Sequence, residues 1–324
     1  MRRVVCEAVG ELDSLVVVDE DPPAPRPGQV IVDVAAAGVN FVDGLFVQGR
    51  YQIKPPTPFT PGSEIAGTVA ALGEGVEGVA VGDRVMAQVG LGGYAEQVAV
   101  AATSLVPLPA GLSFGQAATL VQSYATMLFA YTRRTHVEPG ETVLVLGAGG
   151  GIGLAAIDVA RALGLRPLAA ASTPEKLALA TGQGAEAGID TATEDVKARA
   201  RVLSGTGGVD VVVDPVGGAL AEPALRSLRW GGRYLVIGFA AGDIPRLPAN
   251  QVLLNNRTVV GVDWGAWTLQ RPDEHRALLD ELLGLVDAGK LHPVEPTTYP
   301  LAEAARALTD LAERKVGGKV VLVP

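Results

Sequence analysis

The feature that most constrains the fold of this chain is a glycine-rich segment that joins an apolar run to a helical pattern. Residues 143–146 are all apolar, and five of the seven residues at 147–153 are glycine. Apolar residues then recur at helical spacing as far as Gly164, a residue type that often ends helices. The segment therefore predicts a buried strand, a tight turn and the beginning of a helix.

A turn of this kind suits a pyrophosphate group. Its backbone N–H groups and the positive end of the helix dipole point outward, and a missing Cβ lets phosphate, strand and helix approach closely. The spacing Ala148-x-Gly150-x-x-Gly153 differs at one residue from the dinucleotide-binding pattern. The alternative is an ordinary glycine-rich turn between a strand and a helix. The residues that we expect to bind a dinucleotide here are Gly150, Gly151, Ile152 and Gly153.

Strands and helices alternate along the middle of the chain. The candidate strands are 142–147, 166–171, 186–189, 209–214, 232–237 and 258–263. The candidate helices are 151–163, 174–182, 193–203 and 218–228. Such alternation is typical of right-handed βαβ units, so we expect a doubly wound parallel sheet with helices on both faces, the Rossmann arrangement.

The first part of the chain has a different character. Short apolar runs separated by glycine and proline predict a β-rich domain there. These runs lie near 30–35, 65–70, 81–86 and 94–100, and a helix is expected at 114–132. After residue 264 the pattern changes again, with helices expected at 273–288 and 301–314 and a closing strand at 318–323.

We therefore expect two domains. Residues 122–263 form the dinucleotide-binding domain, inserted between 1–121 and 264–324, which together form the second domain. A chain of 324 residues, 48% of them hydrophobic, is long enough for two cores.

Charge and cysteine content limit the partners and the compartment. The formal net charge of −9 argues against nucleic acid or an anionic membrane as the primary partner. No apolar run reaches the roughly 18 residues of a membrane span, and the start of the chain lacks the apolar core of a signal peptide. Cys6 is the single cysteine, so no disulfide can form within the chain. We expect a cytoplasmic protein.

The end of the second strand bears on the choice of cofactor. An acidic residue that binds the ribose 2′-OH of NAD is expected about 20 residues after the first turn, and Ser172 stands there instead. A hydroxyl tolerates a 2′-phosphate, and Lys176 is close enough to bind it. We therefore expect NADPH. Two alternatives remain: Glu175 takes the place of the acid and selects NADH, or Ser172 or Thr173 only caps a helix and Lys176 is a solvated surface residue.

Further segments resemble one family, the zinc-independent quinone oxidoreductases of the medium-chain dehydrogenase/reductase superfamily, the ζ-crystallin-like group. Besides the glycine-rich turn, they are 36–43, 49–51, 60–67, 82–85, 214–218 and 318–319, in the order of the family. The resemblance covers essentially the whole chain. It implies an α/β fold: a GroES-like β-rich catalytic domain with an inserted Rossmann doubly wound parallel sheet. It also implies NADPH as cofactor and a homodimer paired near residues 259–262.

The residues also argue against a metal. A catalytic zinc needs three protein ligands, and the zinc-dependent relatives would carry cysteine at Asn40 and histidine at Ser63. Structural zinc in those relatives takes four cysteines, and this chain has one. His136, His275 and His292 are far apart in sequence and are expected on the surface or at helix ends. We expect no metal.

A metal-free site that holds NADPH can deliver hydride to an acceptor whose product anion is already stabilised. Quinones and other conjugated carbonyl compounds are small molecules of this kind. The resemblance places Asn40 and Tyr51 in the substrate pocket, where each can donate a hydrogen bond to a carbonyl oxygen, and Tyr51 can relay a proton. The alternatives are that Asn40 only satisfies backbone groups of a turn and that Tyr51 packs in a loop.

The resemblance also implies further cofactor contacts. They are Thr126, Phe239, Asp263, Trp264 and Lys319, with Asn40 near the nicotinamide. The aromatic residues are alternatively core residues, Trp264 and Trp267 alternatively line the substrate site, and Lys319 is alternatively a surface lysine before a strand.

Two positions depart from the family pattern. Phe46 replaces a pocket tyrosine, and Asp190 or Thr191 stands where a tyrosine often covers the adenosine phosphate.

The sequence therefore predicts an NADPH-dependent, metal-independent quinone reductase. The first alternative is an enone or enoyl-CoA reductase of the same fold. The second is a non-catalytic protein that binds NADPH.

Overall fold

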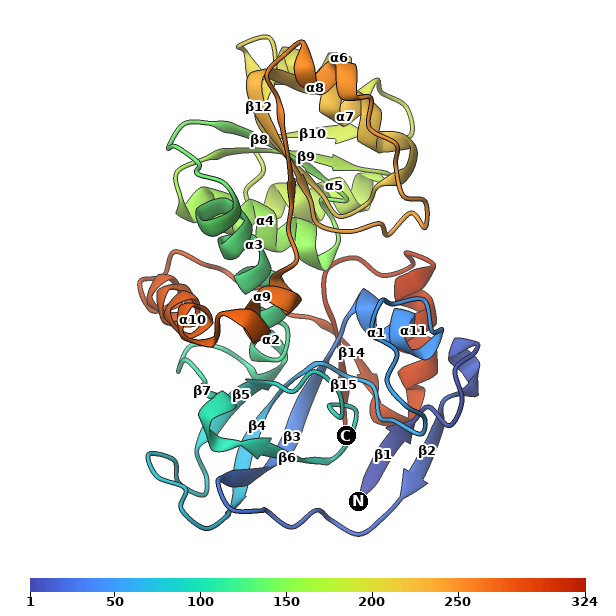
Figure 1. The fold of residues 1–324 in the computed structure, drawn as a ribbon, viewed down its shortest axis with the longest axis vertical. Helices are drawn as coiled ribbons and strands as arrows, with labels where there is room; N and C mark the ends of the chain where they lie inside the picture. Colours follow the sequence, from blue (N-terminus) through green and yellow to red (C-terminus); the bar gives the residue numbers. More distant parts are fainter. The chain divides into compact units, whose positions relative to one another are not determined.

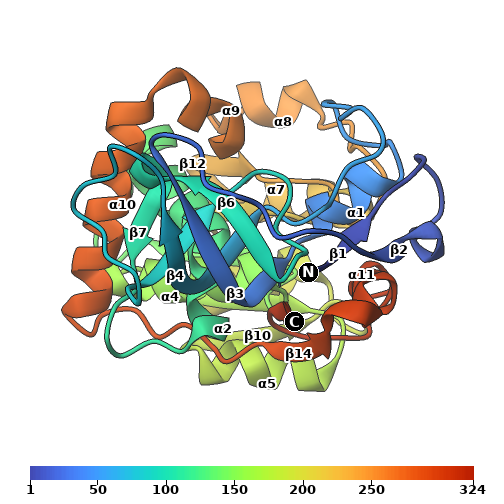
Figure 2. The same cartoon turned by 90° about the horizontal axis from the view of Figure 1, so that it is seen from below.

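The computed structural model describes all 324 residues. Contacts between Cα atoms divide the chain into two compact units. The first unit consists of Met1–Gln122 and Val294–Pro324, and the second of Ser123–Pro293. Both ends of the chain lie in the first unit (Figure 2).

The second unit is built on a six-stranded sheet with the order β10-β9-β8-β11-β12-β13. Figure 1 labels β8, β9, β10 and β12 of this sheet. All neighbouring strands are parallel. The strands are β8 Thr142–Leu146, β9 Arg166–Ala171, β10 Ala187–Asp190, β11 Val209–Asp214, β12 Leu228–Val236 and β13 Thr258–Gly261. The expected parallel sheet of Rossmann type is confirmed.

The connecting helices are α4 Gly151–Ala162, α5 Pro174–Gly182, α6 Val196–Ser204, α7 Ala221–Ser227 and α8 Ala249–Leu253. The central strands β8 and β11 are buried at every residue. Strands covered by helices on both faces read as continuous apolar runs, which is why these two were easy to find in the sequence. One part of the core is formed by Leu144, Leu146, Leu168, Ile189, Val212 and Leu225.

The expected helix at 114–132 is not one regular α-helix. It consists of α2 Phe114–Ala117, a π-helical segment Val121–Ala125, α3 Thr126–Phe129 and a second π-helical segment Ala130–Arg134. Hydrophobic periodicity detects a helical run but does not distinguish an i→i+4 from an i→i+5 bonding pattern, since both leave apolar side chains along one face.

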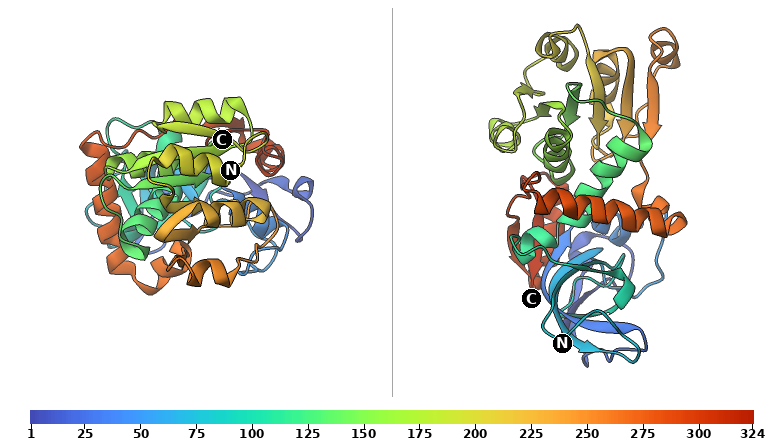
Figure 3. Two further views of the ribbon diagram at one scale, coloured as in Figure 1. Left: turned by 90° about the horizontal axis from the view of Figure 1, so that it is seen from above. Right: turned by 90° about the vertical axis from the view of Figure 1, so that its left-hand side faces the viewer.

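Residues 264–293 lie in the second unit, whereas the sequence pattern predicts that they belong with the first part of the chain. This segment contains α9 Trp264–Gln270 and the long helix α10 Pro272–Asp287 (Figure 3). The centroid of the Trp267 ring lies 4.6 Å from the centroid of the Phe129 ring, which belongs to α3. Tertiary packing against α3 therefore determines to which unit the segment belongs, and local sequence carries no sign of that partner.

The first unit contains a larger, mainly antiparallel sheet with the order β14-β15-β3-β4-β5-β7, in which β6 also pairs with β3. Its strands are β3 Gln29–Val39, β4 Glu64–Leu72, β5 Arg84–Gln88, β6 Gln97–Ala101, β7 Leu105–Pro107, β14 Thr297–Pro300 and β15 Val320–Val323. A separate pair is formed by β1 Arg2–Val5 and β2 Val16–Asp19. The helices α1 Phe41–Val47 and α11 Ala304–Ala312 pack on each other.

No helix of the structure is both long enough and apolar enough to cross a lipid bilayer.

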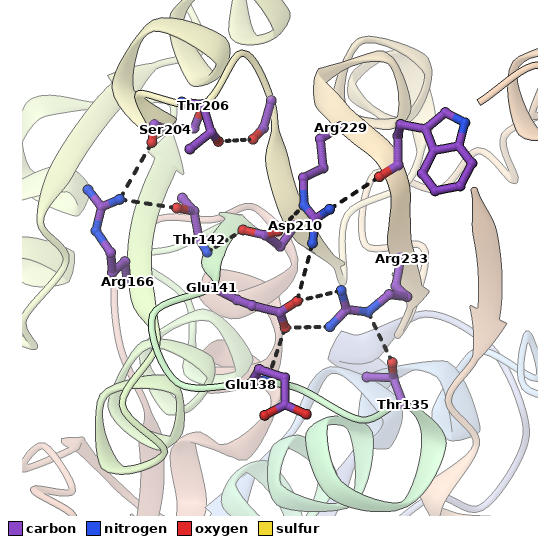
Figure 4. A network of polar contacts seen from close by, with 12 residues as sticks. Thr135, Glu138, Glu141, Thr142, Arg166, Ser204, Thr206, Asp210, Arg229 and Arg233 are labelled. Carbon is purple, nitrogen blue, oxygen red and sulfur yellow. Dashed lines mark hydrogen bonds and ion pairs between the residues drawn. The ribbon is translucent and has the colours of Figure 1, made fainter. Parts of the chain in front are cut away.

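Ionic contacts join three strands of the second unit near the beginning of β8 (Figure 4). Arg233 of β12 donates two hydrogen bonds to Glu141, at 2.8 and 2.5 Å, and both side chains are largely buried. Arg229 of β12 pairs with Asp210 of β11, which in turn accepts a 2.7 Å hydrogen bond from the backbone N–H of Thr142. The attraction between a carboxylate and a guanidinium group paired in this way offsets the free-energy cost of removing both from water.

The Glu141→Gln substitution is expected to destabilise the protein by about 2–3 kcal/mol, because it leaves Arg233 partly buried without its opposite charge. Urea denaturation measures this loss. The matched control is Glu274→Gln, which removes half of an exposed pair with Arg271, and we expect it to cost at most about 0.5 kcal/mol. Equal losses in the two variants would contradict a stabilising role for the Glu141 pair.

The same contact makes stability depend on pH in acid. Burial alone raises the pKa of Glu141, but hydrogen bonds from Arg233 and Glu138 and the nearby positive charges outweigh it, so the pKa is lowered from 4.5. The contribution is present above pH 4.5 and is lost as pH falls through the lowered pKa. The difference in unfolding free energy between wild type and Glu141→Gln should therefore shrink on acidification; a difference that does not change with pH would contradict this.

Candidate functional site

Asn40 lies at the junction of β3 and α1 in the first unit. It follows the last residue of β3 and precedes the first residue of α1. Its backbone N–H donates to Asp43 Oδ2 at 2.8 Å, and the backbone N–H of Asp43 donates back to the Asn40 carbonyl at 3.0 Å. These reciprocal bonds fix the start of the helix and hold the Asn40 side chain in a buried position.

The Asn40 amide is surrounded by polar side chains. Its Nδ2 donates to Glu64 Oε1 at 2.9 Å and, over a longer 3.4 Å, to Ser63 Oγ. Its Oδ1 accepts a 2.9 Å hydrogen bond from Lys319 Nζ. The main chain of Asn40 thus bonds Asp43 at the start of α1, while its side chain belongs to a buried polar cluster.

We call this group the Asn40 cluster: Asn40, Ser63, Glu64, Gln122 and Lys319. Glu64 is 1% exposed, and its Oε2 accepts the backbone N–H of Gln122 at 3.0 Å. Ser63 Oγ donates to Gln122 Oε1 at 2.7 Å. Lys319 Nζ lies 3.5 Å from Glu64 Oε1, and the lysine is only 7% exposed. It is therefore not a surface lysine.

A second buried carboxylate lies beside this cluster. Asp43 is completely buried, and its Oδ2 also accepts the Tyr94 hydroxyl at 3.0 Å. Burial raises the pKa of Asp43 to about 7, the negative charge of Glu64 adds to the rise, and the hydrogen bonds from Asn40 and Tyr94 oppose it. Burial and the negative charge of Asp43 raise the pKa of Tyr94. The site can therefore change its charge near neutral pH.

Tyr51, the other expected catalytic residue, lies in the loop after α1. Its ring packs edge-on against Phe46, with 4.9 Å between the ring centroids. Phe46 thus supports Tyr51 through an apolar contact at the position where the resemblance would place a second pocket hydroxyl. The predicted role of Tyr51 in the substrate pocket stays a prediction.

The glycine-rich turn of the second unit has the geometry expected from the sequence. α4 begins at Gly151 without a side-chain cap, so the N–H groups of its first turn, those of Gly151, Ile152 and Gly153, are left for another partner. A Cβ at Gly153 would collide with the Gly147 carbonyl and with Ala148. This glycine is needed for the close approach of strand and helix.

Two other glycines of the turn differ in their surroundings. A Cβ at Gly149 would lie 2.9 Å from the Cα of Lys176, so this glycine allows the turn to touch the beginning of α5. A Cβ at Gly150 would meet only the Gly147 carbonyl, at 3.4 Å. Packing within the protein therefore does not require glycine at 150, and the open space there suits a phosphate group.

No carboxylate follows β9 directly, where Ser172 is exposed. Thr173 is the N-cap of α5 and accepts the backbone N–H of Lys176 at 3.3 Å. Hydrogen bonds from its own N–H and from Thr173 lower the pKa of Glu175. Glu175 is thus tied into the first turn of α5, while Lys176 lies against the glycine turn at Gly149.

Asp190 and Thr191, which stand at the end of β10 where the family often has a tyrosine, also have structural roles. Asp190 Oδ1 accepts the Ala192 N–H at 2.9 Å and its Oδ2 accepts the Thr193 hydroxyl at 3.0 Å, so the aspartate shapes the turn after the strand. The backbone N–H of Thr191 donates to Ala171 at the end of β9.

The other expected cofactor residues are spread over the second unit. Thr126 is buried at the start of α3. Phe239 lies in the loop after β12, next to Gly217. Asp263 caps α9 by accepting the Ala266 N–H at 3.0 Å. Trp264 is 4% exposed and packs edge-on against His275. The assignment of these four residues to the cofactor stays a prediction.

The structure contains no group of three or more His, Cys, Asp and Glu side chains arranged to hold a metal ion. The side chains of His136 and His292 are mostly exposed. His275 lies against Trp264 and Trp267, and burial lowers its pKa.

Sequence reasoning missed Glu64, Gln122 and the partner of Lys319. Glu64 lies in the segment 60–67 that carries the family resemblance, but no role was assigned to it, and it directly precedes the predicted strand at 65–70. A charged residue next to a predicted buried strand is the signal that could have found it, because such a charge needs a partner. Nothing in the local sequence indicates that Lys319, at the far end of the chain, is that partner.

The chain matches two known domain families. Residues 26–110 match the alcohol dehydrogenase GroES-like domain, and residues 151–283 match the zinc-binding dehydrogenase domain. With the fold and the glycine turn, these matches define an oxidoreductase of the medium-chain dehydrogenase/reductase superfamily. Within it, the chain belongs to the quinone oxidoreductase family.

Similarity to individual relatives extends over the whole chain. The quinone oxidoreductase-like protein 2 of Bos taurus is 40% identical over 99% of this chain and 92% of its own length. The structure of a probable oxidoreductase from Mycobacterium abscessus is 40% identical with a TM-score of 0.89, covering 100% of this chain and 99% of the other. The quinone oxidoreductase of Thermus thermophilus, whose complex with NADPH was also solved, is 38% identical with a TM-score of 0.84 and full coverage of both chains.

The carboxyl carbon of Asp43 is expected to titrate with a midpoint of about 7. Because the folded carboxyl holds its proton more tightly than the unfolded one, it favours folding most below pH 3.8, and this contribution is lost as pH rises through about 7. The ¹³C resonance, assigned by its absence in Asp43→Asn, measures the midpoint. Urea denaturation should show wild type losing stability relative to Asp43→Asn over that range. A midpoint near 4 or parallel stability profiles would contradict the assignment.

Proposed function

We propose that this protein is an NADPH-dependent quinone reductase that works without a metal. The observation that carries the proposal is the Asn40 amide, held in a buried cluster that offers hydrogen-bond donors and lacks a set of metal ligands. Such donors stabilise negative charge that develops on a carbonyl oxygen. Several relatives of the chain are quinone oxidoreductases, which supports this proposal.

The second unit provides a site that fits a dinucleotide. The uncapped first turn of α4 offers N–H groups, and the absent Cβ of Gly150 leaves space for a phosphate. In this proposal Gly150, Gly151, Ile152 and Gly153 bind the pyrophosphate. The assignment of Thr126, Phe239, Asp263, Trp264, Asn40 and Lys319 to the cofactor remains part of the proposal.

Ser172 and Lys176 select the phosphorylated cofactor in this proposal. Ser172 brings no charge that would repel a 2′-phosphate, and the Lys176 ammonium is an attractive point charge near the turn. Glu175, the residue that argues for NADH, already accepts hydrogen bonds within its own helix turn. That engagement makes it a poorer ligand for a ribose hydroxyl.

NADPH, when bound, supplies the hydride. The protein's own residues bind and orient the acceptor: Asn40 donates to its carbonyl oxygen, and Tyr51 donates to it or moves a proton. A quinone suits these residues because its reduced anion is delocalised over the ring and needs little help from a protein acid. Asn40 and Ser63 occupy the positions at which zinc-dependent relatives are expected to carry cysteine and histidine, which supports catalysis without zinc.

The homodimer and the cytoplasmic location belong to the same proposal. β13 lies at one edge of the six-stranded sheet, and Val259 on it and Leu253 and Leu254 nearby are exposed. An edge strand with exposed apolar neighbours can pair with a second copy. Sedimentation velocity measures the mass of the particle, and a species of 33.2 kDa at micromolar concentration would contradict the dimer.

Lys176→Ala is expected to weaken NADPH binding about tenfold, equivalent to about 1.4 kcal/mol, and to leave NADH binding nearly unchanged, because only NADPH has the 2′-phosphate. Isothermal titration calorimetry with both cofactors measures the two dissociation constants. Lys290→Ala, at an exposed lysine of the same unit, is the matched control. Equal weakening of NADPH and NADH would overturn the assignment of Lys176.

Steady-state kinetics with four acceptors tests the reaction. With NADPH, kcat/KM is expected to be highest for 1,4-benzoquinone and 9,10-phenanthrenequinone and lower for crotonyl-CoA and a simple α,β-enone. Dialysis against EDTA should leave the rates unchanged. A preference for crotonyl-CoA or the enone would favour an alkene reductase, and tight NADPH binding without any turnover would favour a non-catalytic protein. Loss of activity on chelation would overturn the metal-free mechanism.

A further inference from the structure

We propose that Glu64 is a positioning residue that sets the orientation of the Asn40 amide and so directs one of its N–H groups toward the acceptor oxygen. This inference rests on the proposed function, in which Asn40 binds the acceptor. It goes further because it assigns a task to a carboxylate that does not itself need to touch the acceptor.

The Glu64 carboxylate receives donors from three separate parts of the first unit. Oε1 accepts Asn40 Nδ2 at 2.9 Å and lies 3.5 Å from Lys319 Nζ, and Oε2 accepts the backbone N–H of Gln122 at 3.0 Å. Glu64 is the first residue of β4, between β3 and β5 in the sheet. Because both oxygens of the carboxylate accept hydrogen bonds, its position is fixed, and it can orient the side chains that donate to it.

The strand opposite Glu64 leaves room for this arrangement. Gly38 of β3 is the register partner of Glu64. A Cβ at Gly38 would lie 2.7 Å from Glu64 Cγ and 2.8 Å from Oε1, and it would also collide with the Ala118 carbonyl. Only glycine at this position lets the Glu64 side chain lie over the strand and reach Asn40.

Charges of opposite sign decide which way the Asn40 amide points. Its Nδ2 faces the Glu64 carboxylate and its Oδ1 faces the Lys319 ammonium. A rotation of the amide by half a turn would place the NH₂ group against the ammonium and the carbonyl oxygen against the carboxylate. Both contacts would be repulsive in a buried site, where charges interact strongly. The amide therefore has one favourable orientation.

This orientation directs the second N–H of Asn40 to Ser63. The distance from Asn40 Nδ2 to Ser63 Oγ is 3.4 Å, which is longer than an ordinary N–H···O hydrogen bond. The Ser63 hydroxyl itself donates to Gln122 Oε1. The second N–H is therefore the weakly held donor of the cluster, and a carbonyl oxygen can replace Ser63 as its acceptor. The geometry selects acceptors that present an oxygen lone pair.

A glutamine side chain in place of Glu64 cannot accept hydrogen bonds at both of its ends, as the carboxylate does. A carboxylate has only acceptor atoms, whereas an amide has one acceptor and one donor end. Because donors face both Oε1 and Oε2, either orientation of the new amide would turn an NH₂ group toward another donor. The Glu64→Gln substitution keeps the volume and removes the property on which the proposal depends.

Kinetics of Glu64→Gln give the first test. We expect kcat for 1,4-benzoquinone to fall by about 10- to 100-fold, because a misdirected donor no longer stabilises the developing charge. NADPH is kept at a saturating concentration for each variant, so that weaker cofactor binding does not contribute to the change in kcat. Unchanged kcat would overturn the proposal.

A double-mutant cycle separates positioning from a general structural role. If Glu64 acts through Asn40, then Glu64→Gln should lower kcat little further in an Asn40→Ala background. Effects on kcat that multiply fully in the double variant would show that Glu64 acts independently of Asn40 and would overturn the proposal. The Glu64→Gln, Lys319→Met variant guards against misfolding, since it leaves no uncompensated charge between these two positions. It should recover thermal stability and keep the low kcat, and recovery of kcat as well would also overturn the proposal.

A measurement on the protein without substrate keeps the inference distinct from the proposed function. The chain has four asparagines, 40, 250, 255 and 256, so ¹⁵N-asparagine labelling yields few side-chain amide signals, and Asn40→Ala assigns the one of interest. Hydrogen exchange of the Asn40 amide should accelerate at least about tenfold in Glu64→Gln. Unchanged exchange would overturn the positioning role even if quinones are reduced. Accelerated exchange in a protein that reduces no quinone would support the positioning of Asn40 while the proposed function fails.

Discussion

A negative charge buried in the first unit is the constraint to which the surrounding structure conforms. Glu64 is almost inaccessible to water, and Asn40, the backbone at Gln122 and Lys319 each contribute a donor that compensates its charge. A carboxylate in such a place is tolerated only when its oxygens are hydrogen-bonded and an opposite charge is near. Gly38, Asn40 and Lys319 are understandable together only through this requirement. Asp43 is buried beside it, and its burial, together with the negative charge of Glu64, raises the pKa of Asp43 to about 7.

The candidate sites of the two units are built from different groups, main chain in the second unit and side chains in the first. In the second unit, glycines remove Cβ atoms so that backbone approaches backbone, and the resulting helix start carries N–H groups without partners. That site is electrostatic and made of main chain. In the first unit the groups are side chains, each oriented by another side chain. The first arrangement suits a phosphate, which accepts from many directions, and the second suits a single oxygen, which must be met by a correctly directed donor.

Local patterns were sufficient for much of the fold. The bounds of β9 and α5 agree with the sequence prediction at each residue, because proline, glycine and a capping threonine mark them locally. The π-helical segments around α3 were not predictable, since a change in backbone bonding leaves the apolar pattern intact. The place of residues 264–293 was also not predictable, because it depends on Trp267 finding Phe129 more than a hundred residues earlier.

The sequence by itself determined the strand–turn–helix geometry of the glycine-rich segment, the lack of an acid directly after β9 and the scarcity of metal ligands. These are properties of neighbouring residues, and short-range sterics and residue chemistry decide them. Only the tertiary structure decided that Lys319 is buried against Asn40 and that Glu64 contacts both of them. Residues 64 and 319 are far apart along the chain, and electrostatic compensation acts through space, so no local pattern could carry that information.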